Sequence, residues 1–204
     1  MTTPDRRDFR SRPRGQTPSR DIEAEIKIPV ENLDSIREAL IGGRATSVHP
    51  MAREVNLLLD TDDGCLQDAG NILRLRRYGS RHILTFKGPA VYHGPVKERP
   101  EHETEIENAE KMLEILDHLG LRAVARYEKD REMWLADEVS VVLDHTPMGD
   151  FVEVEGPQER LQTTAQSLGL DPLTAEKGSY ISLWREHRLR HQEMNLPVDM
   201  VFQT

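Results

Sequence analysis

Alternating apolar and polar residues recur in short runs along most of the chain. In residues 22–28, isoleucine and alanine alternate with glutamate and lysine. This period of two is typical of a β-strand, whose successive side chains point to opposite faces. Similar runs predict further strands over residues 54–60, 72–78, 81–87, 102–107, 124–135, 138–144 and 151–155.

Helices are predicted between several of these strands, where apolar residues recur at intervals of three and four. They cover residues 32–41, 109–119, 158–168 and 177–191. A strand that carries two glutamates two residues apart leads into each of the first three helices. This repeated unit favours a quasi-symmetric sheet with helices packed against it.

The two ends of the chain differ from this pattern. Residues 1–20 contain six arginines, two aspartates and three prolines, but almost no apolar side chains. Such a segment cannot bury enough surface to offset the entropy of ordering, so we expect a disordered basic tail. It is either a plain solvated tail or a tether for an anionic surface. Residues 21–190 are expected to form one domain, and residues 191–204 an irregular C-terminal tail.

Charged side chains fall on one face of the predicted strands, because residues i and i+2 of a strand share a face. Glu23, Glu25 and Lys27, for example, lie opposite the isoleucines of their strand. The carboxylates placed in this way are Glu23, Glu25, Glu103, Glu105, Asp144, Glu153 and Glu155, and the cations are Lys27, Arg74, Arg76, Lys87, Lys129 and Arg131.

Two kinds of sheet give this alternation. An antiparallel sheet with one solvated face is the simpler one. However, pairs of like charge recur on several strands, and since like charges repel, each pair needs a partner of opposite sign. A closed barrel that turns all of these side chains inward provides such partners. We therefore predict an α+β fold, an eight-stranded antiparallel β-barrel tunnel with helices packed on the outside.

The predicted interior suits a polyphosphate and a metal ion. Guanidinium and ammonium groups match the oxygens of a phosphate chain. Carboxylates are the hard oxygen ligands that Mg²⁺ or Mn²⁺ prefers. Because phosphoryl transfer depends mainly on positioning and charge neutralisation, such a cavity could support it.

Several sequence motifs, taken in order, resemble the CYTH family of triphosphate tunnel enzymes, named for class IV adenylyl cyclases and thiamine triphosphatases. The first is Glu23-Ala-Glu25-Ile-Lys27, followed by an aspartate-rich turn at residues 60–64. Leu73-Arg74-Leu75-Arg76 and Leu84-Thr85-Phe86-Lys87-Gly88 come next. The resemblance continues through Glu103-Thr-Glu105, Lys129-Asp-Arg131, Asp144, Glu153-Val-Glu155 and Lys177, and covers residues 21–185.

The resemblance implies a role for each of these residues. The metal ion, Mg²⁺ or Mn²⁺, would be held by Glu23, Glu25, Asp144, Glu153 and Glu155. The triphosphate would be bound by Lys27, Arg74, Arg76, Lys87, Lys129, Arg131 and Lys177, with Lys129 either a ligand or a counter-ion. Glu103 and Glu105 would hold a second metal ion or orient the attacking water, and Lys27 would also assist catalysis.

Two reactions fit the resemblance: hydrolysis of a triphosphate and cyclisation of ATP to cyclic AMP and pyrophosphate. Class IV cyclases carry a His-Phe pair just before the first motif, where this chain has Ser19-Arg20-Asp21. This difference favours a metal-dependent triphosphatase acting on inorganic, nucleoside or other organic triphosphates. Adenylate cyclase is the first alternative, and a non-catalytic triphosphate sensor is the second.

Overall composition narrows the range of partners. The formal net charge of −9 argues against a general nucleic-acid binder. No segment has the roughly 18 consecutive apolar residues of a membrane span, and the N-terminus has no apolar signal region, so we expect a cytoplasmic protein. Its partner would be a small-molecule triphosphate. The resemblance allows a homodimer, although no exposed apolar stripe requires one.

Overall fold

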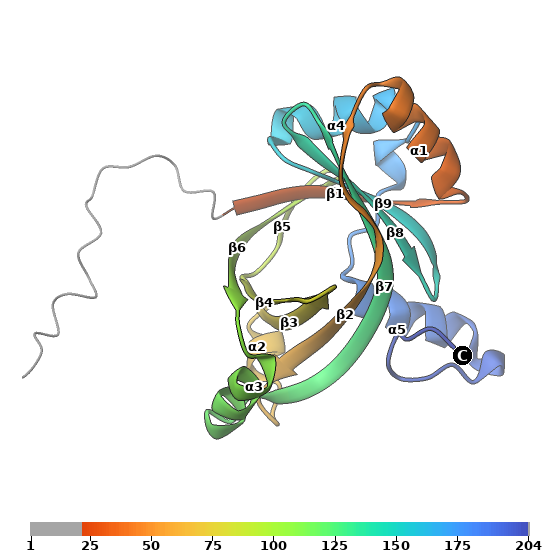
Figure 1. The fold of residues 1–204 in the computed structure, drawn as a ribbon. Helices are drawn as coiled ribbons and strands as arrows, with labels where there is room; N and C mark the ends of the chain where they lie inside the picture. The colour runs from red at the N-terminus through yellow and green to blue at the C-terminus, as the bar shows by residue number, and fades with distance from the viewer. Residues whose placement is uncertain (1–21, 204) are drawn as a thin grey trace, which may run out of the picture.

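Eight antiparallel strands form a closed β-barrel in the computed structural model, which describes residues 22–203 (Figure 1). Around the barrel their order is β1, β9, β8, β7, β2, β3, β4 and β6, and β6 pairs with β1 to close the ring. The strands are β1 (Ile22–Val30), β2 (Thr46–Asp60), β3 (Ile72–Tyr78), β4 (Arg81–Lys87), β6 (Val96–Ile106), β7 (Arg122–Ala136), β8 (Val139–Thr146) and β9 (Gly149–Glu155). The predicted α+β barrel is confirmed.

The barrel closes along the first half of β6, which the sequence pattern did not predict. Residues 97–100 pair with residues 22–25 of β1 on one side. On the other side residues 96–98 pair with β5 (Val91–His93), a short strand that follows β4 after a three-residue break. Pro95 and Pro100 interrupt the alternation here, so only the second half of β6 was recognisable.

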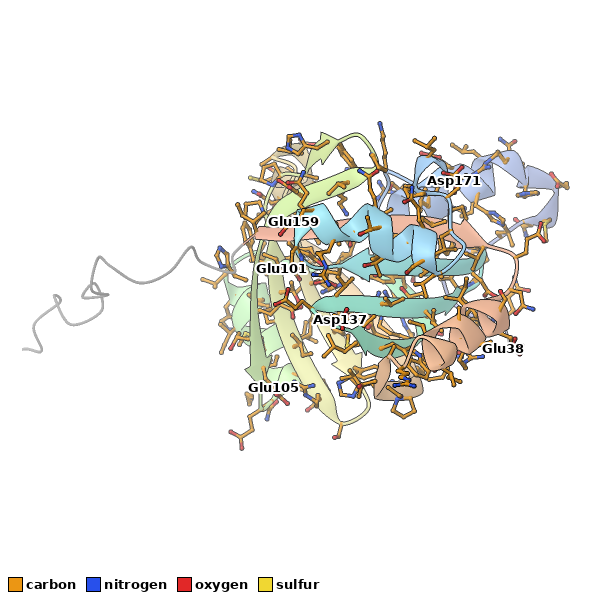
Figure 2. The ribbon with its side chains drawn as sticks, turned by 90° about the horizontal axis from the view of Figure 1, so that it is seen from above. Glu38, Glu101, Glu105, Asp137, Glu159 and Asp171 are labelled. Carbon is orange, nitrogen blue, oxygen red and sulfur yellow. The ribbon has the colours of Figure 1, made fainter. Side chains whose placement is uncertain are left out.

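Two helices cover the outer faces of β1, β8 and β9. They are α1 (Leu33–Gly42) and α4 (Gln158–Ser167), which carry Glu38 and Glu159 in Figure 2. Leu40 and Leu161 of these helices pack against the strand residues Ile26, Val141 and Val154, all nearly or fully buried. The apolar face of the barrel is therefore its outside, because the helices exclude water there.

Two further helices cover other parts of the outer surface. The helix α3 (Ala109–His118) packs through Leu116 against Leu59 and Leu75. The helix α5 (Tyr180–Arg190) begins at the N-cap Ser179, whose hydroxyl accepts a hydrogen bond from the backbone N–H of Ser182. Its Trp184 packs in a separate cluster near one end of the barrel.

Some element boundaries differ from the prediction. The strand β2 begins at Thr46 rather than residue 54, and the aspartate-rich turn is followed by a short helix, α2 (Cys65–Asp68). Two single 3₁₀ turns, η1 (Pro172–Thr174) and η2 (Gln192–Met194), flank α5. The predicted helices otherwise agree with α1, α3, α4 and α5 to within three residues at each end.

The predicted basic tail, residues 1–20, lies outside the described residues. After η2 the chain is irregular up to residue 203, yet it is packed against the barrel. Met200 is fully buried and its backbone bonds to β7, where the amide of Glu128 donates to the Met200 carbonyl at 2.8 Å. Among the helices of residues 22–203, none is long and apolar enough to cross a lipid bilayer.

Candidate active site inside the barrel

Charged side chains from six strands, together with residues of β2 and the first turn of α5, surround a cavity of about 160 Å³ inside the barrel. Strand alternation places these groups inward, because the opposite face of each strand is covered by helices. The predicted residues that line the cavity are Glu23, Glu25, Lys27, Arg74, Arg76, Lys87, Glu103, Lys129, Arg131, Glu153 and Glu155. Sequence positions far apart are thus brought to one site.

The carboxylates of β1 and β9 lie side by side because of the register between these strands. Glu25 is paired with Glu155 in the register, and Lys27 with Glu153. The Lys27 ammonium lies 3.2 Å from Glu153 Oε1, and Glu25 Oε1 accepts from Lys97 Nζ at 2.7 Å. Burial would raise the pKa of Glu25, but Lys27 and Lys97 lower it to about 2, so this carboxylate is ionised at neutral pH.

Glu155 lies in the same acidic group, but none of residues 22–203 forms an ion pair with it. Burial, followed by the neighbouring carboxylate of Glu23, raises the pKa of Glu155 to about 8. Glu155 is therefore mainly protonated at neutral pH, while Lys27, Lys87 and Lys97 pair with the other three carboxylates of the group. Additional positive charge at this end of the cavity would stabilise the ionised form of Glu155.

We tested whether these residues suit a divalent metal ion. Within the described part of the chain, no three acidic, histidine or cysteine side chains are gathered as a metal cage. Instead, lysines contact three of the four candidate ligands on β1 and β9, as for Glu23, which accepts from Lys87 Nζ at 2.7 Å. The chemistry of the donors nevertheless fits Mg²⁺ or Mn²⁺, since two adjacent strands supply four carboxyl groups and one of them, Glu155, forms no ion pair with residues 22–203.

Asp144 lies beside the cavity rather than on its surface. It is fully buried, and its two oxygens accept hydrogen bonds from Arg131 Nε at 2.7 Å and from Lys129 Nζ at 3.0 Å. The Tyr180 hydroxyl donates to the same oxygen as Lys129, at 2.7 Å. Burial and this carboxylate raise the pKa of Tyr180 well above its ordinary value, so the hydroxyl keeps its proton. In this arrangement both Asp144 oxygens already have partners.

Glu54 of β2 is a site residue that the sequence reasoning missed. It is 1% exposed and lies 3.4 Å from Arg76, 3.7 Å from Lys129 and 3.8 Å from Arg131. These cations outweigh burial and hold the pKa of Glu54 well below its ordinary value. The residue was overlooked because its strand carries only this one inward charge. The amide of Asn56, two residues later, was the available signal, and it donates to Glu54 at 2.9 Å.

Arg74 and Arg76 are the cations with the least satisfied donors. Arg74 Nη2 contacts Glu103 Oε1 at 3.3 Å and Thr85 Oγ1 at 3.2 Å. The Nε atoms of both arginines are buried, and no atom of residues 22–203 accepts a hydrogen bond from either. Burial and the neighbouring Arg74 lower the pKa of Arg76. Two adjacent guanidinium groups therefore face the cavity with donors to spare.

Lys87 of β4 joins the acidic and basic parts of the cavity. Its ammonium lies 2.7 Å from Glu23 and 2.6 Å from Glu101. Burial and the positive charge of Arg74 lower the pKa of Lys87 to about 8. Lys87 is therefore mainly protonated at neutral pH, and an anion beside it would stabilise that form.

The first half of β6 adds three cavity residues that the sequence did not reveal: Lys97, Arg99 and Glu101. The guanidinium of Arg99 is buried and donates from Nε to the carbonyl of Gly88 at 2.9 Å. These residues were missed because β6 was predicted to begin at residue 102. The pattern that could have revealed these residues is the charged residue at every second position, Lys97, Arg99 and Glu101, which continues to Glu103.

Two predicted residues lie away from the cavity. Glu105 shares a strand face with Glu103, but it lies near the C-terminal end of β6, beyond the residues that pair with β1, where it is exposed and contacts Arg81 at 3.1 Å. Both Glu101 and Glu105 are labelled along β6 in Figure 2. Lys177 is also exposed, and its ammonium lies 5.9 Å from the ring centroid of Tyr92.

Comparisons with known proteins agree with this fold. The CYTH domain family matches residues 21–175. A protein of Methanocaldococcus jannaschii, provisionally named an adenylate cyclase, is 27% identical over 135 residues, which are 66% of this chain and 76% of that protein.

Solved structures of other proteins have a similar fold. The PH1819 protein of Pyrococcus horikoshii OT3 is 26% identical with a TM-score of 0.69, covering 81% of this chain and 99% of that one. A Vibrio parahaemolyticus protein, provisionally named an adenylate cyclase, is 21% identical with a TM-score of 0.74, covering 81% and 98%. The Hippeastrum protein HpAC1, provisionally named an adenylyl cyclase and described as having a dominant triphosphatase activity, is 18% identical with a TM-score of 0.61, covering 80% and 95%.

Proposed function

The chain belongs to the CYTH family, and we propose that it is a metal-dependent triphosphatase whose substrate binds inside the barrel. One observation carries this proposal: Arg74 and Arg76 are buried at the cavity, and their Nε atoms make no hydrogen bond within residues 22–203, although Glu54 lies 3.4 Å from Arg76 Nε. A buried N–H group without a hydrogen bond is costly, so a site of this kind favours an anion whose oxygens accept from it. A triphosphate provides oxygens along its whole length.

The remaining cations extend this binding surface. Lys27, Lys87, Lys129 and Arg131 approach the same cavity from other strands. Forked guanidinium groups bind phosphate oxygens in pairs, while ammonium groups act as point charges. Each cation that contacts a phosphate would loosen its present contact with a carboxylate, as at Lys87 and Glu23.

The carboxylates released in this way would hold Mg²⁺ or Mn²⁺. Glu23, Glu25, Glu153 and Glu155 are the proposed ligands, and the bound ion would neutralise phosphate charge and polarise a phosphoryl oxygen. Asp144 would instead keep Arg131 and Lys129 in place, because its oxygens already bind these residues.

In the proposed reaction, a water oxygen bonds to the terminal phosphorus of the triphosphate. The bridging P–O bond breaks, the diphosphate leaves with the electron pair, and the hydrogens of the water end on the orthophosphate. Glu103 would orient this water, and its position on the cavity, 3.3 Å from Arg74, supports this role. Arg74 and Arg76 would stabilise the charge on the transferring group.

Adenylate cyclase is the alternative, and the provisional names of the Methanocaldococcus and Vibrio relatives favour it. The dominant triphosphatase activity described for the Hippeastrum protein favours hydrolysis. The absence of a His-Phe pair before Glu23 also favours hydrolysis in this chain. In a cyclase, the ribose 3′-hydroxyl would attack the α-phosphorus and pyrophosphate would leave.

Product analysis tests the proposal directly. Purified protein with Mg²⁺ or Mn²⁺ is offered inorganic triphosphate, ATP and thiamine triphosphate separately, at neutral and alkaline pH. We expect orthophosphate to be released. Glu25→Gln should lower the rate by more than about 100-fold, since it removes the charge of a proposed metal ligand. Glu38→Gln, an exposed change on α1, is the matched control and should keep the full rate.

Other products would overturn the proposal. Cyclic AMP with pyrophosphate would identify a cyclase. Tight binding of triphosphate without any product, measured by calorimetry, would identify a non-catalytic sensor. Equal rates in Glu25→Gln and the wild type would remove the β1 carboxylates from the mechanism.

A further inference from the structure

The first turn of α5 reaches the barrel interior and brings one aromatic ring into the charged site. Tyr180 is 6% exposed and lines the cavity together with strand residues. Its hydroxyl donates a hydrogen bond of 2.7 Å to Asp144 Oδ2. The helix that lies outside the barrel is thereby linked to the residues inside it.

The Tyr180 ring also contacts two of the lysines that face the cavity. Lys27 Nζ lies 4.2 Å from the ring centroid, and Lys129 Nζ lies 4.5 Å from it. The two lysines come from β1 and β7, which are not neighbours in the barrel. Each lysine also pairs with a carboxylate, Lys27 with Glu153 and Lys129 with Asp144. The aromatic face attracts both ammonium groups without adding a further negative charge.

The position of the ring is fixed on several sides. Phe151 packs edge-on against it, with ring centroids 5.5 Å apart. The carbonyl of Gly178 accepts a hydrogen bond from Lys27 Nζ at 3.3 Å. A Cβ at Gly178 would lie 2.7 Å from Ser182 Oγ and 2.9 Å from Leu183 Cδ2, so this turn is packed without spare room.

We propose that Tyr180 is a positioning residue for the triphosphate, which holds Lys27 and Lys129 toward the substrate and fixes Asp144 behind them. This inference rests on the proposed function, because it assigns a role in binding the same substrate. The aromatic ring of Tyr180 fixes the positions of the Lys27 and Lys129 ammonium groups. The Tyr180 hydroxyl and Lys129 donate to the same oxygen of Asp144, so the hydroxyl limits how closely Lys129 approaches this oxygen.

Binding of inorganic triphosphate to metal-free protein tests the inference without turnover. Calorimetry should show weaker binding by about tenfold in Tyr180→Leu, which removes both ring contacts. Tyr180→Phe keeps the ring and loses only the hydroxyl, so we expect a loss of about two- to fivefold. In steady-state hydrolysis the same variants should raise KM more than they lower kcat.

Trp184→Leu separates this role from the stability of α5. Trp184 is 2% exposed, packs in the same helix and does not line the cavity. We expect it to lower the melting temperature at least as much as Tyr180→Leu while the dissociation constant for triphosphate stays within about twofold of the wild type.

Three results would contradict the inference. The inference is wrong if Tyr180→Leu binds triphosphate as tightly as the wild type. It is also wrong if Trp184→Leu weakens binding equally, since helix stability alone would then explain the effect. Should Tyr180→Leu fail to fold, unchanged affinity in Tyr180→Phe would decide against it. A wild-type protein that binds no triphosphate would instead overturn the proposed function.

Discussion

Single residues inside the barrel are arranged so that most carboxylates contact cations from other strands, whereas Glu155 forms no ion pair with residues 22–203. The strand pattern predicted most of these side chains, because alternation alone determines which face a residue occupies. It did not predict that Glu105 is exposed near the end of β6, nor that Asp144 is enclosed by Arg131, Lys129 and Tyr180. Those outcomes depend on how far β6 pairs with β1 and on where α5 packs against the barrel, and no local pattern encodes either.

Glu54 provides a test of this charge balance. Glu54→Gln should lower the free energy of unfolding by about 3–5 kcal/mol, because it leaves Arg76, Lys129 and Arg131 without their shared carboxylate. Inorganic triphosphate should then raise the melting temperature of the variant more than that of the wild type, since the three cations accept a new anion. Thermal unfolding with and without triphosphate measures both effects.

The conservative control is Glu128→Gln, which removes a carboxylate of β7 that points away from the cavity toward Arg53 and Arg126. It should lose stability without gaining extra protection from triphosphate. Equal protection of wild type and Glu54→Gln would show that Glu54 does not compete with an anion for these cations.

At the scale of elements, regular alternation was the feature that made strands predictable. The strands β3, β4 and β9 match their predicted bounds to within two residues. In contrast, β5 and the first half of β6 were missed because Gly88, Pro89, Gly94, Pro95 and Pro100 break the pattern. Pairing with β1 orders this segment, and a pairing partner so far away in the sequence leaves no local signal.

The turn between β2 and α2 depends on a single carboxylate. Asp60 accepts hydrogen bonds from the backbone N–H groups of Thr61 and Leu66, both at 2.8 Å, and of Gln67 at 2.9 Å. Burial would raise the pKa of Asp60, but these three donors outweigh it and lower the pKa. The ionised side chain therefore stabilises the folded state above the unfolded pKa of about 3.9, and this contribution is lost as the pH falls through the lower folded pKa.

We therefore expect Asp60→Asn to lower the free energy of unfolding by about 1.5–3 kcal/mol at pH 7, the range for hydrogen bonds to charged groups. The difference from the wild type should shrink as the pH falls below about 4. Urea unfolding at several pH values measures it, with Asp62→Asn, an exposed neighbour, as the control. A difference that stays constant down to pH 2.5 would contradict this account.

At the scale of the whole molecule, the barrel reverses the usual arrangement of a small domain. Its charged groups lie inside and its apolar faces lie outside, under α1, α3, α4 and α5. Composition indicated this only indirectly, through a charged fraction of 31%. Closure of the barrel could be predicted because pairs of like-charged side chains on many strands require partners of opposite charge. The packing of residues 195–203 against the barrel could not be predicted, since this segment carries no periodic pattern.

That segment supports the site from a distance. Met200 is fully buried against the cluster that contains Tyr127, Tyr180 and Trp184, and Trp184 Nε1 donates to the carbonyl of Val198 at 3.1 Å. Met200→Ser should therefore lower the free energy of unfolding by at least about 2–5 kcal/mol, the loss for truncating a buried methionine to alanine. Its dissociation constant for triphosphate should stay within about twofold of the wild type, as expected for Trp184→Leu. Val198→Ser, at a side chain that is 74% exposed, should change stability by less than about 0.5 kcal/mol. Chemical unfolding and calorimetry compare the two variants. If Met200→Ser also weakens triphosphate binding, the position of α5 over the cavity depends on the C-terminal segment, and loosening of this helix alone reduces affinity.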